Sequence, residues 1–210
     1  RVTVIDSVFL GNVAHLGGAA YVGPNAAISL QGTPSDSIFS SKMQVNGNRS
    51  SEDGGALYNA GGALAIDSSL ITANSTPTQT ALFGYGGAVF SSGVLTLTRS
   101  LLSQNQGRFG GALFIGNGAN PQAVVDRVTF KLNVSGSLGG GLYANTATSN
   151  VAVSNSLFYL NTAGGGGGLA RFNAPMVITN TAFIQNTAIS GGGLSLSAGP
   201  SPNGVLPVNT

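Results

Sequence analysis

Two aspartates, Asp67 and Asp126, stand at matching places in the sequence, each seven residues before an asparagine of a repeated motif. Paired carboxylates carry out glycoside hydrolysis, one as acid and the other as base. If the two stretches form strands that lie two apart in a parallel sheet, the carboxylates are about 9.6 Å apart. An inverting pair is separated by roughly 6.5–9.5 Å. Arg99 lies between the two aspartates in sequence, and Arg127 follows Asp126.

These four residues therefore define the catalytic set of a hypothetical carbohydrate-active enzyme. The competing interpretation is that they form Asp–Arg pairs on a solvated face, where ion pairs are common and nearly neutral for stability. We favour the second interpretation, because the repeats lack the long side loops that would wall a substrate cleft.

Aromatic residues recur at one position, three residues after the second glycine of a repeated Gly-Gly pair. This column consists of Tyr21, Tyr58, Phe90, Phe114 and Tyr143, followed by Ala170 and Ser195. If the column faces outward, it can bind sugars or a protein partner by stacking; if it faces inward, it is simply core. We favour the core, since an exposed aromatic stripe of this length is unusual on a soluble protein.

The sequence contains few other residues suited to catalysis or to binding a metal or nucleic acid. The chain has one histidine, His15, and no cysteine, so neither a His-dependent triad nor a His-rich or thiolate metal site can be assembled. We expect no metal and no cofactor. The basic residues are scattered singly, which excludes the clustered pattern of nucleic-acid binding. No apolar run reaches the ~18 residues of a membrane span.

The elements that must position these residues come from a repeat. Seven repeats align on the pattern apolar-x-x-Asn, for example at Phe9 to Asn12 and Phe158 to Asn161. The motif asparagines are Asn12, Asn46, Asn74, Asn105, Asn133, Asn161 and Asn186. A Gly-Gly pair follows each of them. We predict that these asparagines stack into a structural ladder, since a side-chain amide both donates and accepts hydrogen bonds.

Segments between the motifs, such as VTVIDSVF and VAVSNSLF, alternate apolar and polar residues with the period of a strand. Charged residues make up only 7% of the chain, against about 25% in ordinary globular proteins. Repeats of roughly 28 residues with strand character predict an all-β, single-stranded, right-handed parallel β-helix (solenoid) of about seven coils. We expect the β-helix to span residues 1–198 and a Pro-containing linker or tail to span 199–210.

The paired motifs, FxxN and GGA followed by an aliphatic residue, resemble the repeats of the polymorphic outer membrane proteins. These are autotransporter adhesins whose passenger is a right-handed parallel β-helix. The resemblance covers residues 1–198, although Met43, Ile71 and Leu102 replace the phenylalanine and the later coils have GGG. It implies an extracellular or cell-surface protein.

We therefore expect a structural or interaction segment, either an adhesin passenger or a subunit of a surface filament, and no enzyme activity. The alternative is a polysaccharide lyase or glycoside hydrolase of the β-helix type. Expected partners are other protein subunits or adjacent coils of the same chain, with carbohydrate as a further candidate, and neither nucleic acid nor direct membrane insertion. Asn48 is the one sequon asparagine outside the motif, so we predict it as the glycosylation site of a secreted glycoprotein.

Overall fold

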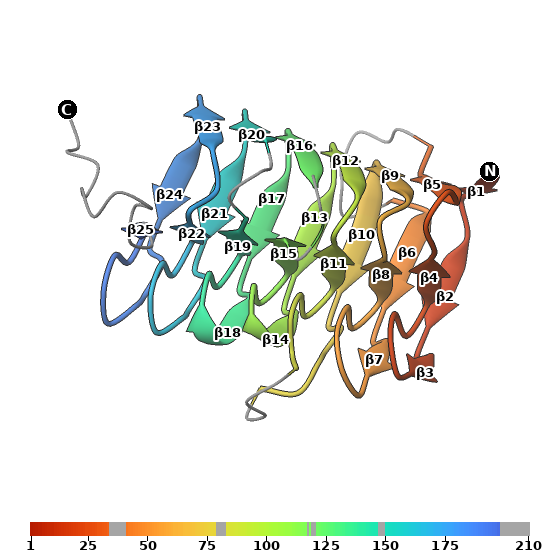
Figure 1. Cartoon of the computed structure of the whole chain (residues 1–210), viewed down its shortest axis with the longest axis horizontal. Coiled ribbons are helices and arrows are strands. Elements are labelled where there is room, and N and C mark those ends of the chain that lie inside the picture. The colour runs from red at the N-terminus through yellow and green to blue at the C-terminus, as the bar shows by residue number, and fades with distance from the viewer. Residues whose placement is uncertain (34–40, 79–82, 117, 119–120, 147–149, 198–210) are drawn as a thin grey trace.

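The structure is a computed structural model that describes residues 1–33, 41–78, 83–116, 118, 121–146 and 150–197. In these residues the chain is all β, with no helix. Its strands form parallel sheets stacked as a β-solenoid of about six turns, roughly 28 residues apart. Figure 1 shows the stack, with β1 and β2 at one end and β24 and β25 at the other. The predicted fold class is confirmed, and the predicted tail, 199–210, lies outside the described residues.

Three sheets of seven parallel strands make up the solenoid. Sheet 1 contains β1 (Val2–Ile5), β5 (Ala27–Gln31), β9 (Ala63–Asp67), β12 (Val94–Thr98), β16 (Gln122–Asp126), β20 (Asn150–Ser154) and β23 (Met176–Thr179). Sheet 2 contains β2 (Val8–Leu10), β6 (Met43–Asn46), β10 (Ser69–Thr72), β13 (Leu101–Ser103), β17 (Thr129–Lys131), β21 (Leu157–Tyr159) and β24 (Ala182–Ile184). Sheet 3 contains β4 (Ala20–Val22), β8 (Leu57–Asn59), β11 (Val89–Ser91), β15 (Leu113–Gly116), β19 (Leu142–Asn145), β22 (Leu169–Phe172) and β25 (Leu194–Ser197).

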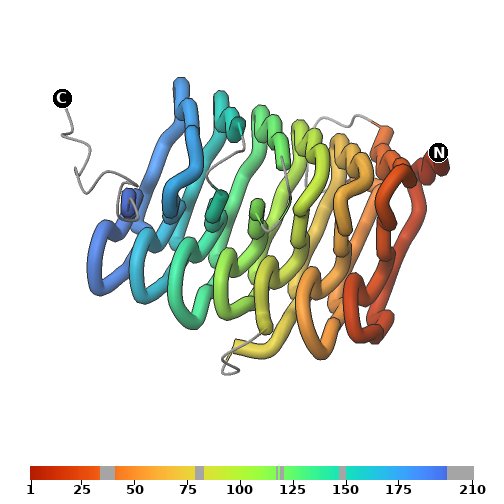
Figure 2. The backbone as a smooth tube through the Cα atoms, viewed as in Figure 1, coloured from red at the N-terminus to blue at the C-terminus, as the bar shows by residue number. Residues whose placement is uncertain are grey.

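Two short strand pairs lie between sheets 2 and 3. They are β3 (Val13–Ala14) with β7 (Arg49–Ser50) and β14 (Gln106–Phe109) with β18 (Val134–Leu138). Each coil thus contributes one strand to each of the three sheets, and Figure 2 shows the coils as a series of similar loops.

Inward side chains of the three sheets form columns that pack into one hydrophobic core. In sheet 2, Phe130, Phe158 and Phe183 stack with ring centroids 4.6 and 4.8 Å apart and planes within 8° of parallel. In-register pairing places identical residue types directly above one another, so the rings meet face to face. The period-2 alternation of the sequence is therefore the alternation between core and outer face.

Among the described residues, positive-φ residues form a column at each of three bends between the sheets. The bend between sheets 1 and 2 uses polar residues such as Arg127 (φ 55°) and Asn155 (φ 49°), and the bend before the motif asparagine uses residues such as Gly47 (φ 62°). The third bend, before sheet 3, uses the first glycine of each Gly-Gly pair, for example Gly86 (φ 66°). Asparagine and glycine tolerate this conformation better than other residues do.

The Gly-Gly bend is also sterically closed to any other residue. A Cβ atom on Gly86 would lie 2.1 Å from the carbonyl oxygen of Val89, in the same coil. A Cβ atom on Gly87 would lie 2.0 Å from the carbonyl oxygen of Gly111, in the next coil. The absence of side chains at this bend therefore allows successive coils to approach to strand spacing.

Candidate functional site

The asparagine ladder runs from Asn12 to Asn186 along the bend that follows sheet 2. The backbone N and Nδ2 of Asn105 both donate to Oδ1 of Asn133, each at 3.0 Å, and Nδ2 also donates to the carbonyl oxygen of Ile71 at 3.0 Å. The same three bonds recur at Asn74 and Asn161. Each of these three asparagines therefore links three successive coils.

The second member of the ladder is Asn48, so the prediction of Asn46 is wrong. Asn48 accepts from the N and Nδ2 of Asn12 at 2.9 and 2.8 Å and donates to Oδ1 of Asn74. Asn46 lies at the end of β6, half-buried, where it bonds Gln44 and Thr72 instead. The physical reason is the bend itself, because the positive-φ residue that must precede the ladder asparagine is Gly47.

The same placement bears on the predicted glycosylation of Asn48. Its side chain is 0% exposed, and its Nδ2 donates to the carbonyl oxygen of Phe9 and to Oδ1 of Asn74. A glycan is attached through this nitrogen, so a glycosylated Asn48 would have to leave the ladder. In the folded chain the structure therefore contradicts the choice of Asn48 as an acceptor.

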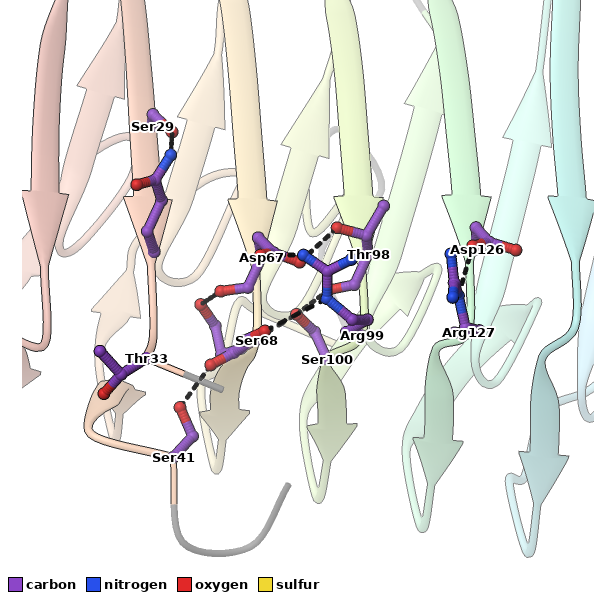
Figure 3. A network of polar contacts seen from close by, with 12 residues as sticks. Ser29, Thr33, Ser41, Asp67, Ser68, Thr98, Arg99, Ser100, Asp126 and Arg127 are labelled. Atoms are coloured by element: carbon purple, nitrogen blue, oxygen red, sulfur yellow. Dashed lines mark hydrogen bonds and ion pairs between the residues drawn. The ribbon is translucent and has the colours of Figure 1, made fainter. Parts of the chain in front are cut away.

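Asp67 and Asp126 are the last residues of β9 and β16, so both lie where the strands of sheet 1 end. Asp67 pairs in register with Thr98, and Thr98 with Asp126, so the two carboxylates are two coils apart with a threonine between them. Figure 3 shows these residues side by side on neighbouring strands. The spacing of the two aspartates from their motif asparagines therefore predicted this alignment correctly.

Both carboxylates are engaged as acceptors. Asp67 accepts from Arg99 Nη2 at 2.5 Å and from Thr98 Oγ1 at 2.6 Å. Asp126 accepts from Arg127 Nε at 2.8 Å, and Asn155 and Ser154 donate to its other oxygen at 2.7 and 2.8 Å.

These hydrogen bonds, first those from Asn155 and Ser154 and then that from Arg127, hold the pKa of Asp126 below its ordinary value. A general acid needs a raised pKa, so that it still holds a proton at the working pH. Asp126 is shifted in the opposite direction, which suits a surface ion pair better than proton donation.

The aromatic column lies on the outward side of sheet 3 yet is largely buried. Phe90 and Phe114 alternate with the inward core residues Val89 and Leu113, but they are only 2% and 0% exposed. They belong, together with Tyr143 and Ala170, to a second hydrophobic cluster separate from the main core. Neither predicted alternative, open outer stripe or main core, describes this arrangement.

Residues that directly precede three of the Gly-Gly pairs cover this second cluster. Tyr85, Phe109 and Leu138 pack against it, and Tyr85 and Phe109 stack with centroids 5.1 Å apart. Towards the N-terminal end, Tyr21 stacks on Tyr58 at 5.5 Å and remains 56% exposed. Of the five aromatic residues of the column, Tyr21 is the exposed one, so a partner would reach the column at its N-terminal end.

Asp53 is a titratable residue that the sequence patterns did not single out. It directly precedes a Gly-Gly pair, at the position that Tyr85 and Phe109 occupy in later coils. Its Oδ1 accepts from the backbone N–H groups of Gly84 and Tyr85, both at 2.9 Å. Burial raises the pKa of Asp53, against the effect of these two donors. Its position in the sequence could have singled it out, because the residues directly before the other Gly-Gly pairs are apolar or small.

His15 contacts Ser51 and Glu52 but forms no relay with them. Ser51 Oγ lies 2.9 Å from His15 Nδ1, and Glu52 Oε1 lies 3.9 Å from the same nitrogen. A triad needs the acid and the nucleophile on opposite ring nitrogens. Among the described residues there is no group of three or more side chains suited to a metal ion.

Comparison with known proteins gave no match. No family model, no curated protein and no solved structure is significantly similar to this chain. Within the described part of the chain, no helix has the length and apolarity needed to cross a membrane.

Proposed function

We propose that this chain is a structural, interaction-bearing β-helix segment of an extracellular or cell-surface protein, either an adhesin passenger or a filament subunit. The observation that carries the proposal is the use of its polar residues. The buried asparagines, and the aspartates at the sheet edge, bond to neighbouring coils instead of converging on one reacting centre. The resemblance of the repeats to those of polymorphic outer membrane proteins supports the surface location.

The two ends of the ladder are complementary. In the described residues, Oδ1 of Asn12 accepts no hydrogen bond, while the backbone N–H of Asn186 donates none. Val2, in an inward column, is 57% exposed at the first coil, and Phe183 is half-buried at the last. Unpaired strand edges and end columns of this kind bind a further coil. We propose that its partner is an adjacent coil, either of the same polypeptide or of another subunit arranged head to tail.

Solution size tests the subunit form of this proposal. Light scattering and small-angle X-ray scattering of the purified chain should show elongated species that lengthen with concentration. Val2→Lys puts a charge into the end column, where a stacked coil would bury it, so it should shift the chain to monomer. Val8→Lys is the matched control, since Val8 is 59% exposed and lies in the outward column of β2. A monomer at all concentrations would contradict head-to-tail assembly by this chain alone.

The surface location needs a separate measurement. An antibody against the chain should label intact cells that make the parent protein as strongly as it labels permeabilised cells. Labelling that appears only after permeabilisation would contradict the location.

A further inference from the structure

A polar groove lies outside the bend between sheets 1 and 2, over the last three coils. Its volume is about 550 Å³, within the roughly 300–1,000 Å³ of small-molecule sites. Each coil contributes three consecutive residues, which are 127–129, 155–157 and 180–182. The groove is therefore built from one three-residue unit repeated at the coil spacing.

One side of the groove carries unused hydrogen-bonding groups. Asn180 Nδ2 donates to Asn155 Oδ1 at 2.7 Å, and Asn155 Nδ2 donates to Asp126 Oδ1 at 2.7 Å. Each amide nitrogen retains a second N–H, and within the described residues Asn180 Oδ1 accepts no bond. Arg127 engages Asp126 through Nε, and its two terminal NH2 groups bind no side chain in the described part of the chain.

Donors and acceptors in alternation, beside an apolar surface, match the chemistry of sugar hydroxyls and ring C–H groups. Leu157 and Ala182 supply the apolar surface, and Thr129 and Thr181 add hydroxyls. The charge of Arg127 is offset by Asp126, its ion-pair partner. The groove therefore offers an anionic ligand little electrostatic advantage over a neutral one.

The repeat of the groove restricts the ligand further. Neighbouring coils are ~4.8 Å apart, whereas an extended peptide advances roughly 3.3 Å per residue and repeats its side-chain direction at twice that distance. A peptide lying along the groove would thus lose register with the amides. The pyranose unit of an extended polysaccharide has a length close to one coil spacing.

We propose that this groove binds a neutral, linear polysaccharide, with one sugar unit to each coil. The inference rests on the proposed surface function and supplies a ligand for it. Asn155 and Asn180 hydrogen-bond the sugar hydroxyls, the terminal NH2 groups of Arg127 donate to a third unit, and Leu157 packs against a ring face.

Isothermal titration calorimetry of the full chain with cellohexaose, laminarihexaose, maltohexaose and a hexagalacturonate tests the proposal. The variant is Asn155→Gly/Asn180→Gly, which removes both amides while keeping the positive φ of each position (49° and 45°). Asn25→Gly is the matched control, because Asn25 is an exposed asparagine with φ 63° on a different bend. Thermal unfolding of all three proteins shows whether the fold is intact.

We expect saturable binding of at least one neutral hexasaccharide, weakened about tenfold or more in the double variant and unchanged in Asn25→Gly. The proposal is overturned if none of the neutral probes binds, if the double variant binds as well as the wild type, or if only hexagalacturonate binds. The head-to-tail proposal is unaffected by these outcomes, since the groove is on the side of the solenoid and assembly is measured by size.

Discussion

Two bends of each coil hold successive coils at strand spacing in opposite ways. At the asparagine bend, a buried side chain spans the space between coils and satisfies backbone groups above and below it. At the Gly-Gly bend, no side chain is present, and the backbones of Gly87 and Gly111 approach so closely that a Cβ atom would overlap a carbonyl oxygen. Side-chain hydrogen bonds between coils stabilise the asparagine bend, whereas the Gly-Gly bend depends on the absence of side-chain atoms. Substitutions at the two bends should therefore lower the free energy of unfolding for different reasons and by different amounts.

The largest effect is expected at the glycine bend. Gly87→Ala forces a Cβ atom to 2.0 Å from the carbonyl oxygen of Gly111, which neither backbone can relieve without separating the coils. We expect a loss of more than about 4 kcal/mol in unfolding free energy, or failure to fold. Gly47→Ala is the control, since nothing lies within 4 Å of its Cβ and only the positive φ, 62°, is strained. Its cost should be about 1–2 kcal/mol. Equal losses in chemical denaturation would show that close approach is not the constraint.

A smaller effect is expected at the asparagine bend. Asn161→Ala leaves the N and Nδ2 of Asn133 without their acceptor and the carbonyl oxygen of Phe130 without its donor. Stranding buried partners in this way should lower the unfolding free energy by about 1–3 kcal/mol. Asn46→Ala, outside the ladder, should cost less. If urea titration gave Asn46→Ala the larger loss, the ladder assignment would be wrong.

The smallest effect is expected at the bend between sheets 1 and 2, where the polar side chains face solvent. The folded pKa of Asp126 is lowered, so its stabilising contribution is present above the unfolded value of about 3.9 and disappears as pH falls through the folded value. The contribution should stay within the about 0–1 kcal/mol of exposed ion pairs. Asp126→Asn should therefore flatten the stability profile slightly below pH 4 and leave its shape above pH 5 unchanged. A steep change near neutral pH in this variant would contradict the assignment.

The sequence predicted the solenoid because every coil repeats the same three-part pattern of strand, asparagine and Gly-Gly. It assigned the wrong ladder asparagine in the second coil, because MQVN and VNGN both satisfy apolar-x-x-Asn. Of the two asparagines, only Asn48 is preceded by a positive-φ residue. The pairing register of Asp67 and Asp126 followed directly from the repeat.

The burial of the aromatic column did not follow from the repeat. In the structure Phe90 and Phe114 alternate with the aliphatic core residues Val89 and Leu113, and the residues that cover them come from the preceding bend. Tyr85, Phe109 and Leu138 differ in type, and the equivalent positions in the last two coils are Gly165 and Ser190. A cover formed in only some coils leaves no periodic signal in the sequence.

Hydrogen exchange of the asparagine side-chain amides tests the central claim, that a buried ladder ties the coils together, most directly. Each interior ladder Nδ2 donates two bonds, so both of its protons are held. By nitrogen-15 NMR, the side-chain amides of Asn74, Asn105, Asn133 and Asn161 should exchange far more slowly than those of the exposed Asn25 and Asn150. Exchange of the ladder amides as fast as that of Asn25 and Asn150 would contradict the account.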